Sequence, residues 1–247
     1  MSRLRVLGSG DAFNAAGALH SAYLLEGPES SLLLECGPAV LAGLKRASID
    51  TSTIDGVLIS HLHGDHFGGI AYLYLEYVFA NPRTRPLIIA GPPGLESRVH
   101  TVYEALYSEK IFQKIHFEIR YVEVAPEEEH EIVGFNVRSF QVPHSAEPFS
   151  LGYSIAAADG RSMVFSGDSA WTDEFLKHTK GADLFLCECC SMKPAAPIHT
   201  SYQDILSHSD QLGCRRVLLT HVGQDVRESS DLQLEIAYDG MTVELGG

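Results

Sequence analysis

Short apolar runs separated by Gly, Pro and Ser turns fill the first half of the chain. Runs of this length that are rich in Leu, Ile and Val predict buried strands, and apolar positions that recur every three or four residues predict helices. The apolar segment 70–80 is expected to pack on a sheet or on a partner. The predicted strands are residues 3–10, 21–27, 30–37, 56–60 and 86–91, and the predicted helices are residues 39–47 and 96–112.

The second half begins with strands and then alternates helices with strands. Four strands are predicted at residues 117–124, 135–142, 151–157 and 162–168, with a hairpin turn at Asp159 to Arg161. Helices at 172–179 and within 201–213 then alternate with strands at 183–189 and 215–221. Because no Ser/Pro-rich linker interrupts the pattern, we expect residues 1–247 to form one α/β domain, with two similar layers face to face and helices outside.

Composition and charge restrict the class of partner. The chain has a formal net charge of −14, whereas binding of long nucleic acid rests on clustered Lys and Arg. No stretch approaches the roughly 20 apolar residues of a membrane span. We therefore expect a soluble, cytoplasmic protein that acts on a small molecule. The longest charged run, residues 126–131, is expected to be a solvated loop.

The five cysteines show no disulfide-framework spacing, which fits a reducing compartment. Three of them lie in the sequence CECC at residues 187–190, which suggests a metal site at first sight. This sequence ends an apolar run, however, and cysteine in a strand buried on both faces acts as a small apolar residue. We expect these thiols to be structural.

Three histidines and an aspartate occur within six residues directly after the predicted strand 56–60. The sequence SHLHGDHFGG at residues 60–69 contains them. We expect a loop here, because loops at strand ends can point several side chains at one centre. From the composition of this chain, an HxHxDH pattern arises by chance on the order of once in a thousand such chains. The motif is therefore a candidate site.

Three more candidate ligands fall where predicted strands end: His144, Asp168 and His221. Taken singly, each is weak evidence, because a lone His at a strand end is more often a hydrogen-bonded polar residue than a metal ligand. Together with the motif they supply five His and two Asp, the ligand types of catalytic Zn²⁺, Mn²⁺ or Fe sites rather than of a closed structural zinc site. Seven ligands are too many for one tetrahedral ion. Two ions about 3.5–4 Å apart that share a carboxylate would use them all.

These segments resemble the metallo-β-lactamase fold hydrolases. The resemblance implies an αββα sandwich of two mixed sheets with helices outside, and a dinuclear metal site at one edge of the strands. It covers nearly the whole chain. The segments that carry it are HLHGDH (61–66), VPHS (142–145), SGDSAW (166–171) and LLTHVG (218–223), supported by LGSGDAF (7–13) and LLLECGP (32–38).

The resemblance also implies a role for each ligand. One ion would be held by His61, His63 and His144. The other would be held by Asp65, His66 and His221, with Asp168 bridging the two. Zn²⁺ is the expected metal, with Mn²⁺ or Fe as alternatives. Glu35 stands where relatives usually show Asp, in a supporting position.

Within this superfamily the chain is similar to the phosphodiesterase branch that includes RNase Z. The sequence HTSY at residues 199–202 carries this similarity and implies that His199 protonates or stabilises the leaving group. Asp65 would accept a proton from the attacking water. The chain lacks room for the inserted arm with which RNase Z grips tRNA, and its last motif ends differently, as THVGQDV. The expected substrate is therefore a small phosphodiester such as a cyclic nucleotide.

Two other functions stay open at this point. The same ligands would serve a hydrolase of a carboxylic ester, lactone, thioester or β-lactam. A redox or binding protein is the third alternative, but diiron members of the superfamily have Glu in place of His63, and degenerate members lose ligands. The segment 70–80 and the tyrosines near Tyr103 are expected to pack in the core or in a homodimer. The less favoured alternative is that they cover the substrate.

Overall fold

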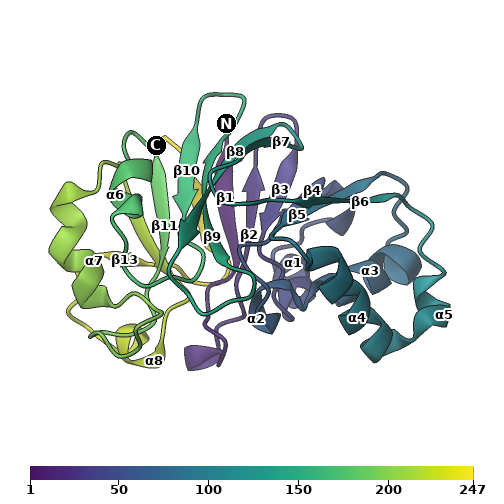
Figure 1. The fold of residues 1–247 in the computed structure, drawn as a ribbon, viewed down its shortest axis with the longest axis horizontal. Helices are drawn as coiled ribbons and strands as arrows, with labels where there is room; N and C mark the ends of the chain where they lie inside the picture. Colours follow the sequence, from purple (N-terminus) through teal and green to yellow (C-terminus); the bar gives the residue numbers. More distant parts are fainter. Residues whose placement is uncertain (247) are drawn as a thin grey trace.

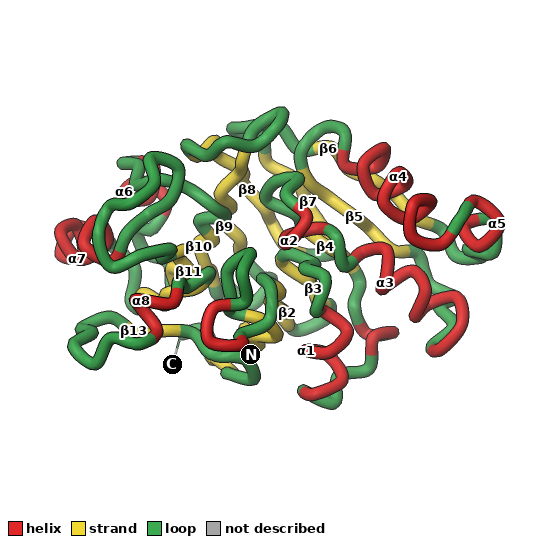
Figure 2. The backbone as a smooth tube through the Cα atoms, turned by 90° about the horizontal axis from the view of Figure 1, so that it is seen from below, coloured by secondary structure: helices red, strands yellow, loops and turns green. Residues whose placement is uncertain are grey.

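Two seven-stranded sheets pack face to face in the computed structural model, which describes residues 1–246. Helices lie on the outer side of each sheet (Figures 1 and 2). The predicted αββα architecture of two mixed sheets with helices outside is therefore confirmed. No helix in residues 1–246 combines the length and the apolar character that crossing a membrane requires.

The first sheet is formed mainly by the first half of the chain. Its outer face is covered by α1 (Val40–Arg46), α3 (Ile70–Leu75), a π-helical turn (Glu76–Ala80) and α4 (Leu95–Tyr107). A short helix α2 (Gly64–Phe67) follows β4, and α5 (Glu109–Phe112) follows α4. The strand order is β14 (Thr242–Glu244), β1 (Arg3–Gly8), β2 (Ala22–Glu26), β3 (Ser31–Leu34), β4 (Gly56–Leu58), β5 (Leu87–Gly91) and β6 (Ile119–Glu123).

The second sheet is formed by the second half of the chain. Helices α6 (Glu174–His178), α7 (Tyr202–His208) and α8 (Gln224–Arg227) accompany it. Three 3-10 turns complete the structure, at Ala15–Gly17, Thr51–Thr53 and Ser209–Gln211. The strand order is β13 (Glu235–Ile236), β12 (Val217–Thr220), β11 (Leu184–Glu188), β10 (Ser162–Phe165), β9 (Ser150–Ala156), β8 (Phe135–Val142) and β7 (Glu129–Ile132).

The two sheets share one pairing pattern. Each has three antiparallel pairings at one side and three parallel pairings at the other. The antiparallel strands come early in each half, where the chain can return by short turns, and the parallel strands come where helices provide the crossovers. The exception is β14, which brings the C-terminal end of the chain back to pair with β1 (Figure 1).

Apolar side chains form three clusters that match the layers. One fills the space between the sheets, with Tyr153 and Phe135 among its largest members. The other two lie between each sheet and its helices. The segment 70–80 belongs to the cluster on the first sheet, with Tyr74 and Tyr77 fully buried, so the expectation that it packs on a sheet is confirmed. Tyr103 is likewise buried and contacts the Tyr74 ring, with 5.7 Å between centroids.

Three local predictions were wrong. The acidic run 126–131 is not all loop, because its last residues begin β7, an edge strand on which alternate side chains reach water. The helix predicted at 96–112 breaks at Ser108, whose φ of 73° separates α4 from α5. The motif 60–66 is a loop only as far as His63, and Asp65 and His66 lie on α2.

Candidate metal centre

The histidines and aspartates predicted from the sequence converge at one place. The motif follows β4, His144 follows β8, Asp168 follows β10 and His221 follows β12. These elements come from both sheets, so the site spans the edge of the sandwich. The predicted ligands form two groups of side chains whose nitrogen and oxygen atoms lie within 4.8 Å of one another: His61, His63 and His144; and Asp65, His66, Asp168 and His221. A third such group overlaps the second and consists of Asp168, Glu188, His199 and His221.

A close backbone contact positions α2 against the end of β3. The Cys36 amide donates to the His66 carbonyl at 2.6 Å, and the Gly69 amide donates to the Cys36 carbonyl at 2.7 Å. A Cβ on Gly69 would stand 2.1 Å from the Gly37 carbonyl oxygen, so only glycine fits there. This contact fixes the direction in which Asp65 and His66 leave α2.

The first group consists of three imidazoles that face one another. His144 Nε2 lies 3.2 Å from His63 Nδ1, and the His61 ring is 4.6 Å from the His63 ring and 4.9 Å from the His144 ring, centroid to centroid. Hydrogen bonds on their far sides orient two of these rings. His61 Nδ1 pairs with the Ser60 hydroxyl at 2.9 Å, and His144 Nδ1 lies 3.0 Å from the Ile198 carbonyl, to which it can donate.

The second group is built around the carboxylates of Asp65 and Asp168. His66 Nε2 lies 3.2 Å from Asp65 Oδ2 and 3.3 Å from Asp168 Oδ2. His221 Nε2 lies 3.5 Å and 3.4 Å from the same two oxygens. His221 itself has a φ of 50°, a conformation uncommon for residues other than glycine. Backbone strain of this kind clusters at functional sites.

The donor atoms present suit divalent metal ions. His61 Nε2 and His66 Nε2 are buried and have no hydrogen-bond partner among the described residues. Buried polar atoms are rarely left without a partner, so such atoms call for an explanation. A cation within each group would supply one, since neutral imidazole and carboxylate are the ligands of catalytic zinc sites. None of the cysteines in residues 1–246 belongs to a metal-ligating group.

Burial and charge act in opposite directions on the pKa values in the site. Burial lowers the pKa of His61. For Asp65, burial favours a higher pKa, but the hydrogen bond from His221 and the neighbouring His66 ring outweigh it and hold the pKa below its usual value. For His221, burial favours a lower pKa, but the Asp168 charge and the hydrogen bond to Asp65 raise it to about 9. The acidic cluster thus attracts positive charge.

Glu35 supports the site by contacting Ser60 and His66. Its Oε1 accepts a hydrogen bond from the Ser60 amide at 3.1 Å, and its Oε2 lies 3.6 Å from His66 Nδ1. The side chain is fully buried, and burial raises its pKa. A carboxylate behind the second nitrogen of a metal-ligating histidine is the usual way in which the ring is oriented.

His199 lies beside both groups, as its assignment to the site requires. Its ring centroid is 4.9 Å from that of His144 and 6.0 Å from that of His221. His199 Nδ1 lies 3.0 Å from Glu188 Oε2 and 3.2 Å from Glu188 Oε1. Burial favours a lower pKa for His199, but the hydrogen bond to Glu188 raises it above its usual value.

Glu188 is the site residue that the sequence did not single out. It ends the apolar strand β11, is buried, and accepts hydrogen bonds from the amides of Ser169 at 2.8 Å and Thr200 at 3.1 Å. Its Oε2 also lies 3.6 Å from His221 Nδ1. A charged residue that ends a fully apolar run was the available signal, because a carboxylate is almost never buried without partners.

The chain is similar to known proteins in sequence and in fold. The sequence model of the family described as "Anti-Pycsar protein Apyc1" matches residues 2–238. A curated relative, Ribonuclease Z from Agathobacter rectalis, is 23% identical over 260 residues, which cover 84% of this chain and 83% of the relative.

Two solved structures are similar over nearly their whole length. The metallo-β-lactamase fold protein YhfI from Bacillus subtilis has a TM-score of 0.77 and 23% identity, covering 99% of this chain and 100% of that one. Human tRNase Z, short form, has a TM-score of 0.79 and 24% identity, covering 98% and 99%. The chain therefore has the metallo-β-lactamase fold that the sequence motifs predicted.

Proposed function

The chain belongs to the Anti-Pycsar protein Apyc1 family, and from this premise we propose that it is a metal-dependent phosphodiesterase that hydrolyses a small phosphodiester such as a cyclic nucleotide. The observation that carries the proposal is the His199–Glu188 pair next to two groups of metal-ligating side chains. In metal-assisted hydrolysis at phosphorus, the ions stabilise charge on the phosphoryl oxygens and a general acid gives a proton to the departing alkoxide.

Two divalent ions fit the donor set. His61, His63 and His144 would hold one, Asp65, His66 and His221 would hold the other, and Asp168 would bridge them. Zn²⁺ is the metal best matched to these imidazole and carboxylate ligands, and Mn²⁺ or Fe are the alternatives. When bound, the ions would activate water near neutral pH and neutralise charge on the phosphoryl oxygens.

His199 is the proposed general acid. Glu188 accepts from Nδ1–H and so leaves Nε2 to face the reacting group, as in other pairs where a carboxylate orients a histidine. The same carboxylate raises the pKa of His199, so the ring holds the proton that the leaving group needs. Asp65 would take the proton from the attacking water, and its lowered pKa means that it is ionised at neutral pH.

Charge and loop length favour a small substrate. The net charge of −14 would repel a long polyanion. The connection between β10 and β11, residues 166–183, contains only the short helix α6 and leaves no room for an inserted arm. The relatives named Ribonuclease Z and tRNase Z support chemistry at phosphorus. The negative charge and the short connection shift the proposed substrate from RNA to a small phosphodiester.

A hydrolysis panel tests the proposal. Purified protein of measured metal content would be assayed on 3′,5′-cyclic nucleotides, bis(p-nitrophenyl) phosphate, p-nitrophenyl acetate, a lactone and a thioester. We expect turnover of the phosphodiesters, and His199→Ala should lower kcat by 10²–10⁴-fold with metal content unchanged. His116→Ala, an exposed histidine elsewhere, is the control. Preference for the acyl compounds would replace the proposal with an acyl-ester hydrolase.

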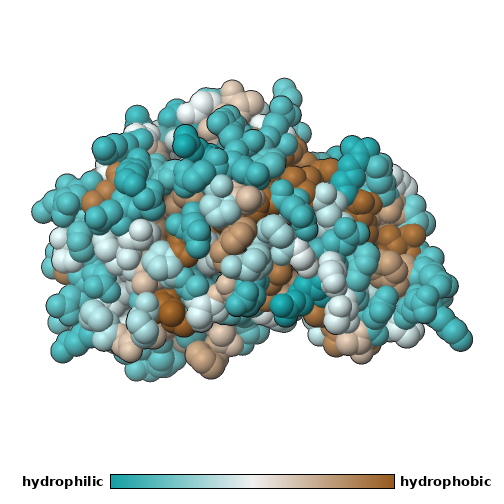
Figure 3. All heavy atoms as spheres, in the orientation of Figure 1, coloured by the Kyte–Doolittle hydropathy of each residue, from teal (hydrophilic) through white to brown (hydrophobic). Residues whose placement is uncertain are grey.

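Self-association through the helices of the first sheet is a separate proposal. Phe79 and Leu106 are about half exposed, at 52% and 49%, and both lie on this helical layer. Most of the face in Figure 3 is hydrophilic, and apolar atoms gather toward the side of these helices. Sedimentation velocity of the wild type and of a Phe79→Ser, Leu106→Ser variant would test it. A monomeric wild type would contradict it.

A further inference from the structure

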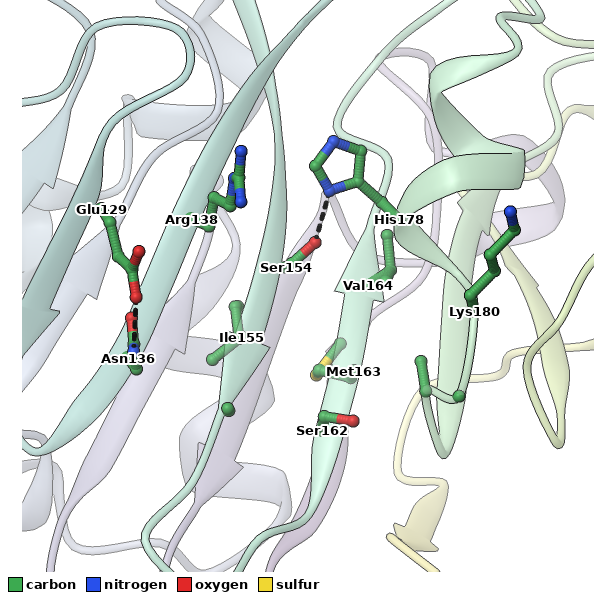
Figure 4. A pocket seen from close by; sticks show the side chains of 13 residues that line it. Glu129, Asn136, Arg138, Ser154, Ile155, Ser162, Met163, Val164, His178 and Lys180 are labelled. Carbon is green, nitrogen blue, oxygen red and sulfur yellow. Dashed lines mark hydrogen bonds between the residues drawn. The ribbon is translucent and has the colours of Figure 1, made fainter.

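A pocket lies on the outer face of the second sheet, at a place separate from the metal centre. Its volume is about 260 Å³. Outward-facing side chains of β8, β9 and β10 form its floor, and the turn that follows α6 forms one wall (Figure 4). We call it the outer-sheet pocket. Its lining includes Arg138, Ser154, Ser162, His178 and Lys180.

We propose that the outer-sheet pocket binds a small molecule that carries a phosphate group, at a site separate from the metal centre. Two cationic residues, Arg138 and Lys180, line the pocket at opposite sides (Figure 4). Arginine offers a planar fork that matches phosphate oxygens, and lysine adds a point charge. Two such cations at one small pocket stand out in a chain whose net charge is −14.

Neither cation lies in a short ion pair among the described residues. The carbon stem of Lys180 lies against Gly213, where a Cβ would be 3.3 Å from Lys180 Cγ. The turn is tied down by the Gly181 amide, which donates to the Gly213 carbonyl at 3.0 Å. Arg138 has only a long, exposed ion pair, 3.8 Å from Glu127, and such a pair contributes little. Both heads are therefore available to an anion.

The acidic groups nearby are already engaged. Glu129, the one carboxylate that lines the pocket, accepts a hydrogen bond from the side-chain amide of Asn136 at 2.8 Å. Asp183, next to the pocket wall, accepts from the Ser162 amide at 3.0 Å and lies 3.6 Å from both Arg161 and Arg215. Glu129 stands opposite Arg138 in the pairing of β7 with β8, but neither Glu129 nor Asp183 forms an ion pair with Arg138 or Lys180.

Neutral polar groups complete the pocket. His178 stacks on Phe140 at 3.9 Å between centroids, and its Nδ1 pairs with the Ser154 hydroxyl at 2.9 Å. The hydroxyls of Ser154 and Ser162 can donate to an anion, and the small side chain of Ala156 leaves room for an uncharged body. The volume suits a molecule no larger than a mononucleotide.

The strands under the pocket lead to the metal centre. β8 is followed by His144, and β10 is followed by Asp168. A ligand that ties the turn after α6 to β8 and β10 would thus contact the two strands whose ends carry proposed metal ligands. The proposal does not rest on the phosphodiesterase activity, since it follows from the pocket alone.

An NMR titration tests the site on metal-loaded protein. Inorganic phosphate and adenosine 5′-monophosphate would be added to ¹⁵N-labelled protein, and the amides of Gly181 and Ala156 would report the outer-sheet pocket. The amides of His66 and His221 would report the metal centre. We expect saturable shifts at Gly181 and Ala156. Shifts confined to His66 and His221 would overturn the proposal.

Two variants distinguish binding in the outer-sheet pocket from a general effect of surface charge on binding. The double variant Arg138→Ala, Lys180→Ala should weaken binding at the pocket at least tenfold, as judged by the Gly181 shift. Lys177→Ala is the matched control, because Lys177 is exposed on α6, just before the turn that carries Lys180, but pairs with Glu174 and does not line the pocket. Equal affinity in wild type and double variant, or equal loss in the control, would overturn the proposal.

Discussion

His199 Nδ1 lies 3.0 Å from Glu188 Oε2, and Glu188 is itself held by the amides of Ser169 and Thr200. The imidazole is therefore oriented by a carboxylate that cannot rotate away. Rigid support of this kind sets the direction of a proton transfer, because catalytic groups must be held within about 0.5 Å of the productive geometry.

Substitution of Glu188 by Gln should lower turnover without removing the metal ions. Gln keeps an oxygen for the two amides but loses the charge that orients and protonates His199. We expect kcat for a phosphodiester to fall by about 10–100-fold with KM little changed. Metal content by plasma mass spectrometry and the pH profile of kcat would be measured together, with the exposed Glu118→Gln as control. An unchanged kcat and pH profile would mean that His199 acts without Glu188.

Removal of metal should abolish activity and lower the melting temperature. The buried nitrogens of His61 and His66 have no hydrogen-bond partner in the described part of the chain, so the native state gains partners when ions bind. A ligand that binds only the folded state at 100 times its Kd adds about 2.7 kcal/mol to stability. Calorimetry before and after chelation and re-addition of Zn²⁺ would measure this. Full activity in protein shown to be metal-free would contradict the two-ion proposal.

The sequence predicted the candidate metal ligands better than the residues that hold the site in place. His61, His144 and His221 could be found because each follows an apolar run, and strand ends on both sheets meet at one edge. Glu188 escaped notice because its partners, the amides of Ser169 and Thr200, come from segments 12 or more residues away. Hydrogen bonds of this kind depend on packing, which no local pattern encodes.

The edge strands of the two sheets were also hard to predict. β7 contains the charged residues of an edge strand, where one side faces water and no apolar run is needed. β14 has only three residues and becomes a strand by pairing with β1, more than 230 positions earlier in the chain. Both strands owe their structure to the neighbour that they pair with, whereas central strands such as β3 have buried side chains on both faces and are predictable from composition.

Substitution of Gly69 by Ala should destabilise the protein and weaken metal binding. A Cβ would stand 2.1 Å from the Gly37 carbonyl oxygen and 2.6 Å from the Cys36 carbonyl oxygen, both of them backbone atoms. Overpacking of this kind costs about 1–3 kcal/mol, and relief would move α2 with Asp65 and His66. Gly64→Ala is the matched control in the same motif, because a Cβ there would meet nothing within 4 Å. Urea unfolding and zinc titration would compare them, and equal stability of the two variants would contradict the prediction.

Stability should also depend on Glu26 in a pH-dependent way. Arg3 Nε and Arg5 Nε donate to Glu26 Oε2 at 2.5 Å and 2.7 Å. Burial favours a higher pKa for Glu26, but the bonds to Arg3 and Arg5 lower it below its usual value of 4.5. A carboxylate with a lowered pKa stabilises the fold above its unfolded pKa, and this contribution is lost as pH falls through the folded pKa.

The lowered pKa of Glu26 predicts how the stability of a Glu26→Gln variant should differ from that of the wild type. The variant should be less stable than wild type at pH 7, by no more than about 1 kcal/mol because the pair is partly exposed. The difference should disappear as pH falls below 4.5. Thermal unfolding between pH 7 and pH 3 would measure it, with the exposed Glu29→Gln of the same hairpin as control. A difference that persists undiminished at pH 3 would assign the effect to packing.

Tyr153 connects the second sheet to the strand that carries the histidine motif. Its hydroxyl donates to the Ile59 carbonyl at 2.8 Å, and the neighbouring Leu151 amide donates to the Ser60 carbonyl at 3.0 Å. Tyr153→Phe would leave a buried carbonyl without its donor, at a cost of about 1–3 kcal/mol. Urea unfolding should show this loss, whereas Tyr238→Phe, at a position 61% exposed, should not. Because Ser60 also fixes the His61 ring, we expect the Tyr153 variant to bind Zn²⁺ more weakly as well, and unchanged zinc affinity would show that β4 alone positions the motif.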